Sequence, residues 1–256
     1  MDIVPFLSPA PGFVLQANAV ECTTYWQRES KSALAGLDHC LRSFYKEESL
    51  DSLWSEHLRA YEDAVAMLQQ LGPSLEAIAG RFGEPVNSAT LEIVLMPNLL
   101  DAKGRGYSLS TAQCTWLFLG PVDESSQAEG LAVHELLHRW VDVAADKTVR
   151  NSGEADPMLK ARALFPIVAE SYSDLAIWVG ETVVRAATAW LVPNLQKPAL
   201  QSTDELLAYY EQIGFIGIQE AHRHLVGEPE RPPRDVIHEA VALVYHRVLS
   251  ELSSTG

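Results

Sequence analysis

The 256-residue sequence predicts a predominantly α-helical α+β protein in which a small mixed or antiparallel sheet packs on a central helix. Apolar residues recur at helical spacing in both halves of the chain, whereas short β-rich runs occur between residues 91 and 119. Hydrophobic residues make up 47% of the chain and charged residues 21%, as in ordinary globular domains. We therefore expect one folded unit over residues 1–256, with a helical N-terminal layer over 1–86 and the remaining elements over 87–256.

The N-terminal layer is predicted from apolar spacing between about residues 17 and 82. Leu34, Leu37 and Leu41 would share one face of a helix, and Gly72-Pro73 would interrupt the run. We therefore expect this segment to be helical.

The sheet is predicted from three short segments. Residues 91–96 form a β-rich run that Pro97 ends, and residues 115–119 form another that Gly120-Pro121 ends. Between them, a glycine-rich turn would lead into a third short strand over residues 107–110. We therefore expect a small sheet.

The second half of the chain is predicted to be helical. Residues 126–129 have the capping-box pattern, so a helix should begin near Ser126 and run to about Ala145. A polar loop is expected over residues 142–162. Three further helices are expected, over residues 164–191, 203–225 and 235–252.

A candidate metal-binding motif lies within the helix that begins near Ser126. Residues 134–138 read HELLH, so His134 and His138 are four positions apart and project from one helical face. Two imidazoles one turn apart can share one tetrahedral metal ion. Glu135 lies beside that face, where its carboxylate can act as a general base toward a metal-activated water without binding the metal.

A second pair of residues supplies a candidate third ligand. Glu170 and Asp174 are also four positions apart and would share one face of the expected helix over residues 164–191. Burying two carboxylates in an otherwise apolar helix is costly unless a cation or hydrogen-bond donors compensate. A divalent ion bound by Glu170, with Asp174 accepting a hydrogen bond from a ligand imidazole, would compensate both. Exposure to solvent, or ion pairs with Arg162 or Arg185, is the alternative.

Together these motifs resemble the gluzincin, or thermolysin-like, zinc metallopeptidases, whose signature is HExxH on one helix followed by Glu-x-x-x-Asp on a later one. The resemblance implies a zincin-like fold, a Zn²⁺ cofactor and hydrolysis of peptide bonds in a peptide or protein substrate. The roles it implies are zinc ligand for His134, His138 and Glu170, catalytic carboxylate for Glu135, and orientation of His134 for Asp174.

The resemblance spans about residues 91–181 and rests on motifs rather than on the whole chain. Ala169, and not an asparagine, precedes Glu170, and the segment between His138 and Glu170 is longer than in the most compact members of the group. No histidine occurs between His138 and His222, which excludes the metzincin type. Four acidic residues of the intervening segment are alternative third ligands: Asp142, Asp146, Glu154 and Asp156.

The resemblance also implies an oxyanion-stabilising donor and a substrate-binding strand. In thermolysin-like enzymes the donor is a downstream His or Tyr, and we favour His222 or His224. Three tyrosines are the other candidates: Tyr209, Tyr210 and Tyr245. In zincins an extended peptide pairs with the outer strand of the sheet. The substrate-binding residues would then be Gly106, Tyr107 and Ser108.

Charge and composition exclude several other classes of protein. A net charge of −15 disfavours binding to nucleic acid or to an anionic membrane surface. The apolar stretch over residues 165–192 is not a membrane span, because charged residues interrupt it: Glu170, Asp174, Glu181 and Arg185. Three scattered cysteines and an N-terminus without the pattern of a secretory signal predict a cytoplasmic protein.

Two other functions are compatible with the same residues. Two histidines and a carboxylate also suit a non-haem Fe(II) oxygenase or another metal-dependent modifying enzyme. Such an enzyme has little use for a general base at Glu135, so that residue favours hydrolysis. The other alternative is a binding module that keeps a zincin scaffold without turnover.

Overall fold

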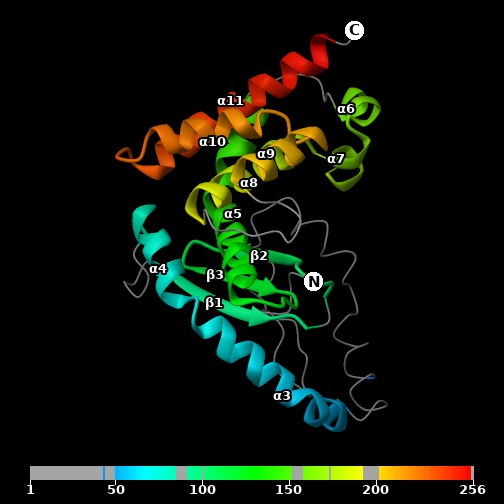
Figure 1. Cartoon of the computed structure of the whole chain (residues 1–256), viewed down its shortest axis with the longest axis vertical. Coiled ribbons are helices and arrows are strands. Elements are labelled where there is room, and N and C mark those ends of the chain that lie inside the picture. The colour runs from blue at the N-terminus through cyan, green and yellow to red at the C-terminus, as the bar shows by residue number, and fades with distance from the viewer. Residues whose placement is uncertain are drawn as a thin grey trace.

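The computed structural model describes residues 43, 50–84, 91–99, 101–151, 158–172, 174–192 and 202–254. These residues form a mostly helical α+β fold, in which a three-stranded mixed sheet packs against the long helix α5 (Ser125–Asn151) (Figure 1). Further helices precede the sheet and follow α5. The predicted fold class is confirmed.

Two helices of the N-terminal layer lie within the described residues. They are α3 (Leu50–Gln69) and α4 (Gly72–Arg81). Pro73 lies in the first turn of α4, where its missing N–H removes no helical hydrogen bond. Leu75 and Ile78 are buried in the core. The helical expectation for residues 17–49 falls outside the described residues, apart from the helical Ser43.

The sheet has the strand order β1-β3-β2, so β1 (Glu92–Pro97) and β2 (Gly106–Ser110) are its outer strands. The central strand, β3 (Cys114–Leu119), pairs parallel with β1 and antiparallel with β2. Its position between two neighbours explains why all but one of its residues are buried. The three predicted strands are confirmed, with boundaries that differ by one residue.

Helix α5 is longer than predicted. It continues to Asn151, so the expectation of a loop that begins at residue 142 is wrong. Ala144 and Ala145 are buried in the core, and Arg150 pairs with Asp146 one turn earlier, so this polar stretch still has an apolar face and side-chain pairs that favour a helix. Residues 152–157 of the expected loop fall outside the described residues.

Helix α8 (Leu175–Leu191) packs closely against α5. Small residues allow this approach. A β-carbon at Gly180 would lie 3.4 Å from Asp142 Oδ1 and 3.5 Å from the β-carbon of Ala145. Trp178 and Val183 of α8 are fully buried, so the contact between the two helices belongs to the core.

The single helix expected over residues 164–191 is wrong. The structure has α6 (Met158–Leu164), α7 (Pro166–Ser171) and α8 instead. Pro166 has no N–H with which to continue α6 and begins α7. Asp174 has extended backbone, and its Oδ1 accepts a hydrogen bond of 2.7 Å from Ala176 N, so it caps α8. Glu170 and Asp174 therefore do not share the face of one helix.

The remaining helices are α9 (Thr203–Gln212), α10 (Ile218–Gly227) and α11 (Pro233–Ser254). The single helix expected over residues 203–225 is wrong, because Gly214 and Gly217 have φ angles of 114° and 83°, which interrupt a helix. Helices α10 and α11 contact α8, and all three lie on the side of the molecule away from the sheet (Figure 1).

Buried apolar side chains from α4, β3, α5, α8, α10 and α11 form one hydrophobic core. The helices that approach each other at the centre of this core, α5 and α8, are therefore supported from both sides. Among the residues that the structure describes, no helix combines the length and the apolar character needed to cross a membrane.

Candidate metal centre

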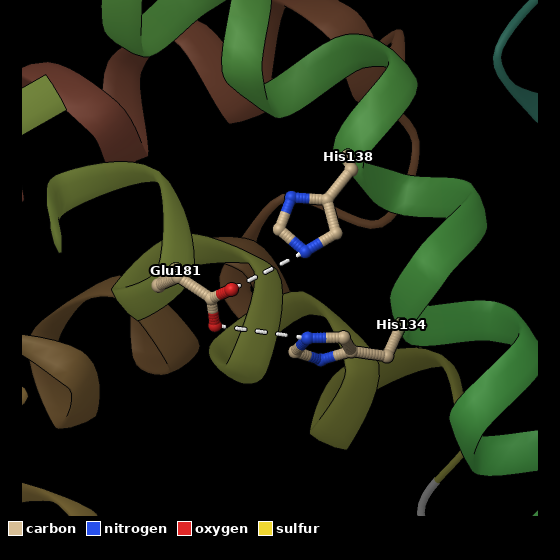
Figure 2. Close-up of side chains that lie close together, drawn as sticks. All are labelled: His134, His138 and Glu181. Carbon is tan, nitrogen blue, oxygen red and sulfur yellow. Dashed lines mark ion pairs between the residues drawn. The ribbon is translucent and has the colours of Figure 1, made fainter. Parts of the chain in front are cut away.

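The two histidines of the HELLH motif lie one turn apart on α5 and face the same way. Their ring centroids are 5.1 Å apart, and each side chain is 16% exposed. Leu136 and Leu137 between them are fully buried in the core. This apolar surface fixes the rotation of the helix, so that His134 and His138 are turned toward α8 (Figure 2).

The carboxylate that the structure brings to these imidazoles is that of Glu181 on α8. Glu181 Oε2 lies 3.7 Å from His134 Nε2, and Oε1 lies 3.5 Å from His138 Nε2 (Figure 2). One potential ligand atom from each residue can be chosen so that all three lie within 4.8 Å of one another. Ligand atoms about 2.1 Å from one tetrahedral zinc ion are about 3.4 Å apart. The two nitrogen–oxygen distances, 3.7 and 3.5 Å, are close to that separation.

The hydrogen bonding of Glu181 also fits a metal ligand. Its Oε2 is buried and accepts no hydrogen bond among the described residues, although Arg185 Nη2 forms an ion pair with it at 3.3 Å. Buried carboxylate oxygens are normally hydrogen-bonded, because leaving one without a partner costs free energy. A cation held between Glu181 and the two histidines would satisfy this oxygen.

Asp142 lies on the outer side of His138. Its Oδ1 is 2.9 Å from His138 Nδ1, the ring nitrogen that does not face Glu181. Burial alone would lower the pKa of His138. The neighbouring carboxylates, Asp142 first, have the larger and opposite effect, so the pKa is raised to about 10. The metal-free imidazole is therefore protonated at neutral pH, and binding of a metal would displace a proton from it.

Glu135 is almost completely buried, with 5% of its surface exposed. Burial raises the pKa of its carboxyl group to about 7, and the positive charge of His138 opposes that shift. Gly106, at the beginning of β2, lies against the side chain: a β-carbon there would be 2.9 Å from Glu135 Cγ and 3.0 Å from Oε1. The carboxyl group is thus enclosed between α5 and the outer strand.

Arg185 lies one turn after Glu181 and links the centre to two tyrosines. Its Nη2 donates to the Tyr172 hydroxyl at 3.2 Å, and its Nη1 donates to the Tyr210 hydroxyl at 3.5 Å. The guanidinium also lies over the ring of Phe215, 4.6 Å from its centroid. Burial, and then the charge of Glu181, raises the pKa of Tyr172, which keeps its hydroxyl protonated and able to donate.

The predicted third ligand, Glu170, lies in α7, and its side chain falls outside the described part of the structure. Its assignment stays a prediction. Asp174 caps α8, as described above, and its expected orientation of His134 also stays a prediction. Among the alternative ligands, Asp142 contacts the outer nitrogen of His138, and Asp146 pairs with Arg150.

The predicted oxyanion donors lie on the C-terminal helices. His224 Nε2 is 3.1 Å from Glu239 Oε2. The pKa of His222 is lowered by burial, against the charge of Asp204. These described contacts do not include the residues of the centre, so a catalytic role for either histidine stays a prediction. Of the three candidate tyrosines, Tyr210 is the one that the described contacts connect to Arg185.

The expected substrate-binding residues begin β2, which is an outer strand of the described sheet. The ring of Tyr107 stacks on that of Phe118 at 4.6 Å, so this residue packs on the sheet. Gly106 borders Glu135, as described above, and Ser108 pairs with Leu117 of β3. Their contact with a substrate stays a prediction.

Three residues of this region were not predicted as part of the site: Glu181, Arg185 and Tyr172. Glu181 and Arg185 were recognised as charges in an apolar segment, but not as members of the site. The signal that could have identified them is their spacing, because an acidic residue four positions before an arginine in an otherwise apolar helix must be compensated locally. Which neighbour compensates it depends on packing between helices.

Comparisons of the chain with protein-family models, with curated proteins and with solved structures find no match. The class of protein is therefore defined by the fold and the site. It is a mostly helical α+β protein with a candidate metal centre formed by His134, His138 and Glu181.

Proposed function

We propose that the protein is a zinc-dependent hydrolase that cleaves peptide bonds, with Glu135 as the general base. The observation that carries the proposal is the position of the Glu181 carboxylate between two imidazoles, next to a buried glutamate whose pKa is about 7. A general base works best when its pKa lies near the working pH, because it can then both accept and release a proton.

Zinc is the metal that this set of ligands favours. Catalytic zinc sites commonly have three protein ligands of the His and carboxylate type and leave a fourth position for water. Two histidines and a carboxylate can also bind Fe(II). The presence of Glu135 beside the ligands favours zinc and hydrolysis, because Fe(II) oxygenases do not need a general base at that position.

Each residue then has a chemical role. Bound zinc would supply a Lewis acid that acidifies a water molecule and polarises the substrate carbonyl. Glu135 accepts the proton of the attacking water and passes it to the leaving amine. Among the described residues, the Tyr172 hydroxyl and the Arg185 guanidinium lie beside Glu181 and are candidate donors to stabilise negative charge on the substrate oxygen.

The outer strand β2 supports a peptide as the substrate. It pairs with β3 on one side, and its first residue lies against Glu135. An extended peptide that paired with β2, an outer strand of the described sheet, would bring its backbone past the general base. Peptide hydrolysis therefore uses the strand, the base and the metal ligands together.

The test begins with metal content. Elemental analysis of wild type, Glu181→Ala and Glu170→Ala, purified without affinity metals and then incubated with zinc, should find one zinc per wild-type chain. We expect Glu181→Ala to lose most of it. Full retention in that variant, together with loss in Glu170→Ala, would identify Glu170 as the third ligand instead. Wild type that binds no zinc would contradict the metal centre itself.

The test of the reaction uses a peptide library read by mass spectrometry. Zinc-loaded wild type should cleave peptides, whereas zinc-loaded Glu135→Gln should bind zinc and fail to cleave. Equal cleavage by both would contradict the role of Glu135. Wild type that binds iron in preference to zinc and cleaves no peptide would favour the oxygenase alternative.

A further inference from the structure

The ring nitrogen of His138 that does not face Glu181 also has a carboxylate partner, and the proposed set of ligands gives that partner no role. A metal-binding imidazole must present an unprotonated nitrogen to the ion, and the hydrogen bond made by its other nitrogen decides which one that is. In His138 the nitrogen toward Glu181 is Nε2, at 3.5 Å from Oε1, and the other is Nδ1, at 2.9 Å from Asp142 Oδ1.

From this geometry we infer that Asp142 is a positioning residue, whose carboxylate accepts a hydrogen bond from His138 Nδ1 and so fixes Nε2 as the metal-binding atom. The inference rests on the proposed metal centre. Since Asp142 contacts the nitrogen that does not face Glu181, it acts through His138 and is not itself a ligand.

The fold holds this pair in two ways. Asp142 is four positions after His138 on the same helix, so the helical backbone alone places the two side chains together. Helix α8 approaches at Gly180, directly before Glu181, and a β-carbon there would already be 3.4 Å from Asp142 Oδ1. A glycine therefore leaves room for the carboxylate where the two ligand-bearing helices meet.

A carboxylate partner also changes the imidazole electronically. Its negative charge makes Nε2 a stronger electron donor toward a cation and reduces the freedom of the ring to rotate. Loss of such a partner weakens metal binding by roughly 10–100-fold in known sites. The same order of effect is expected here, with no change in the ligands themselves.

The experiment measures zinc affinity by competition with a chromogenic chelator. Asp142→Ala should bind zinc roughly 10–100-fold more weakly than wild type. Asp142→Asn should recover part of the loss, because its amide oxygen still accepts the hydrogen bond from Nδ1 but carries no negative charge. Asp146→Asn is the matched control: this carboxylate lies one turn further along α5 and pairs with Arg150, so its change should leave the affinity unaltered.

A second readout separates positioning from a general loss of structure. Long-range ¹H–¹⁵N NMR of the zinc-loaded protein should show His138 protonated at Nδ1 in wild type and in Asp142→Asn. A wild-type spectrum with the proton on Nε2 would overturn the inference, and so would unaltered zinc affinity in Asp142→Ala. Wild type that binds no zinc would overturn the proposed function as well, so the two failures are distinguishable.

Discussion

At the scale of single residues, the buried carboxyl group of Glu135 makes the stability of the fold depend on pH. Its pKa is about 7 in the folded protein against 4.5 for an ordinary glutamate, and burial is the main cause. Because the folded pKa is raised, the stability that depends on the protonated form is fully present below pH 4.5 and is lost as the pH rises through 7. Ionisation of Glu135 thus destabilises the metal-free fold.

Glu135→Gln should therefore stabilise the metal-free protein at pH 8 by about 1–3 kcal/mol, and by much less at pH 4.5. Urea denaturation in the presence of a chelator at several pH values measures the difference. Glu62→Gln, a change at an exposed carboxylate of α3, is the control for a general effect of charge. A stability difference that stays constant from pH 4.5 to 8 would show that ionisation of Glu135 is not its source.

Ionised Glu135 destabilises the metal-free fold, whereas Arg185 stabilises it, because its guanidinium lies beside the negative charge of Glu181. Arg185→Met should destabilise the metal-free protein by about 1–3 kcal/mol, since it removes one of the two cations beside the buried Glu181 carboxylate and leaves protonated His138 as the other. Added zinc should then raise the melting temperature of Arg185→Met more than that of wild type, because the ion replaces the lost charge. Thermal unfolding with and without zinc tests this, with Arg185→Lys as the conservative variant. Equal zinc-induced shifts in all three proteins would contradict the pairing.

At the scale of elements, the placement of Glu135 depends on how closely β2 approaches α5. A β-carbon at Gly106 would lie 2.9 Å from Glu135 Cγ and 3.1 Å from Leu131 Cδ1, closer than side chains normally pack. The first residue of the outer strand is therefore part of the enclosure of the Glu135 carboxyl group.

Gly106→Ala should destabilise the protein by about 1–3 kcal/mol, because either the strand or the Glu135 side chain must move. Gly80→Ala is the matched control, since a β-carbon at this helical position of α4 meets no atom within 4 Å. That change should be neutral or stabilise by up to about 1 kcal/mol. Denaturant unfolding measures both.

A double-mutant cycle identifies the contact that is responsible. In a Glu135→Ala background the Gly106→Ala change should destabilise less than in wild type, because the side chain that it contacts is shorter. If the two changes were simply additive, the crowding would have to arise elsewhere.

The helices and strands show which features of the structure were predictable from the sequence. Helical spacing alone brings His134 and His138 together, so their pairing was predictable without any knowledge of the fold. The strands were predictable to within one residue, because prolines and glycines bound their apolar runs. The partner carboxylate was not, because several acidic residues follow His138 and the way in which α8 packs against α5 decides that Glu181 faces the histidines. The helix boundaries at Pro166 and Asp174 were not predicted, although proline and an N-capping aspartate are local signals for a boundary. The apolar periodicity of the segment continues across both positions and favoured one long helix.

At the scale of the whole molecule, the centre joins two helices that the core already holds in place. The buried apolar cluster extends over the sheet and the helices on both sides of α5 and α8. The protein should therefore remain folded without metal, unlike small zinc domains whose folding requires the ion. The far-UV circular dichroism spectrum should not change when a chelator is added, and its collapse would contradict this expectation.

Zinc should nevertheless stabilise the folded protein by mass action. At a free concentration of 100 times the dissociation constant, a ligand contributes about 2.7 kcal/mol, which corresponds to a rise of roughly 5–10 °C in melting temperature for a chain of this size. His134→Ala should abolish the rise, whereas His57→Ala on the exposed face of α3 should retain it. A rise that persists in His134→Ala would place the bound zinc at another site.

The close approach of α5 and α8 at Gly180 also affects the size of the cation that the candidate centre can bind. Two of the three candidate ligands lie on one helix and the third on its neighbour, so the separation of the helix axes should influence the radius of the ion that fits. Because small residues at the crossing let the two helices approach closely, we expect the centre to prefer a small cation with ligands at about 2.1 Å, such as zinc, over calcium, whose ligands lie at about 2.4 Å. A larger residue at position 180 would widen the gap and shift the preference toward larger cations.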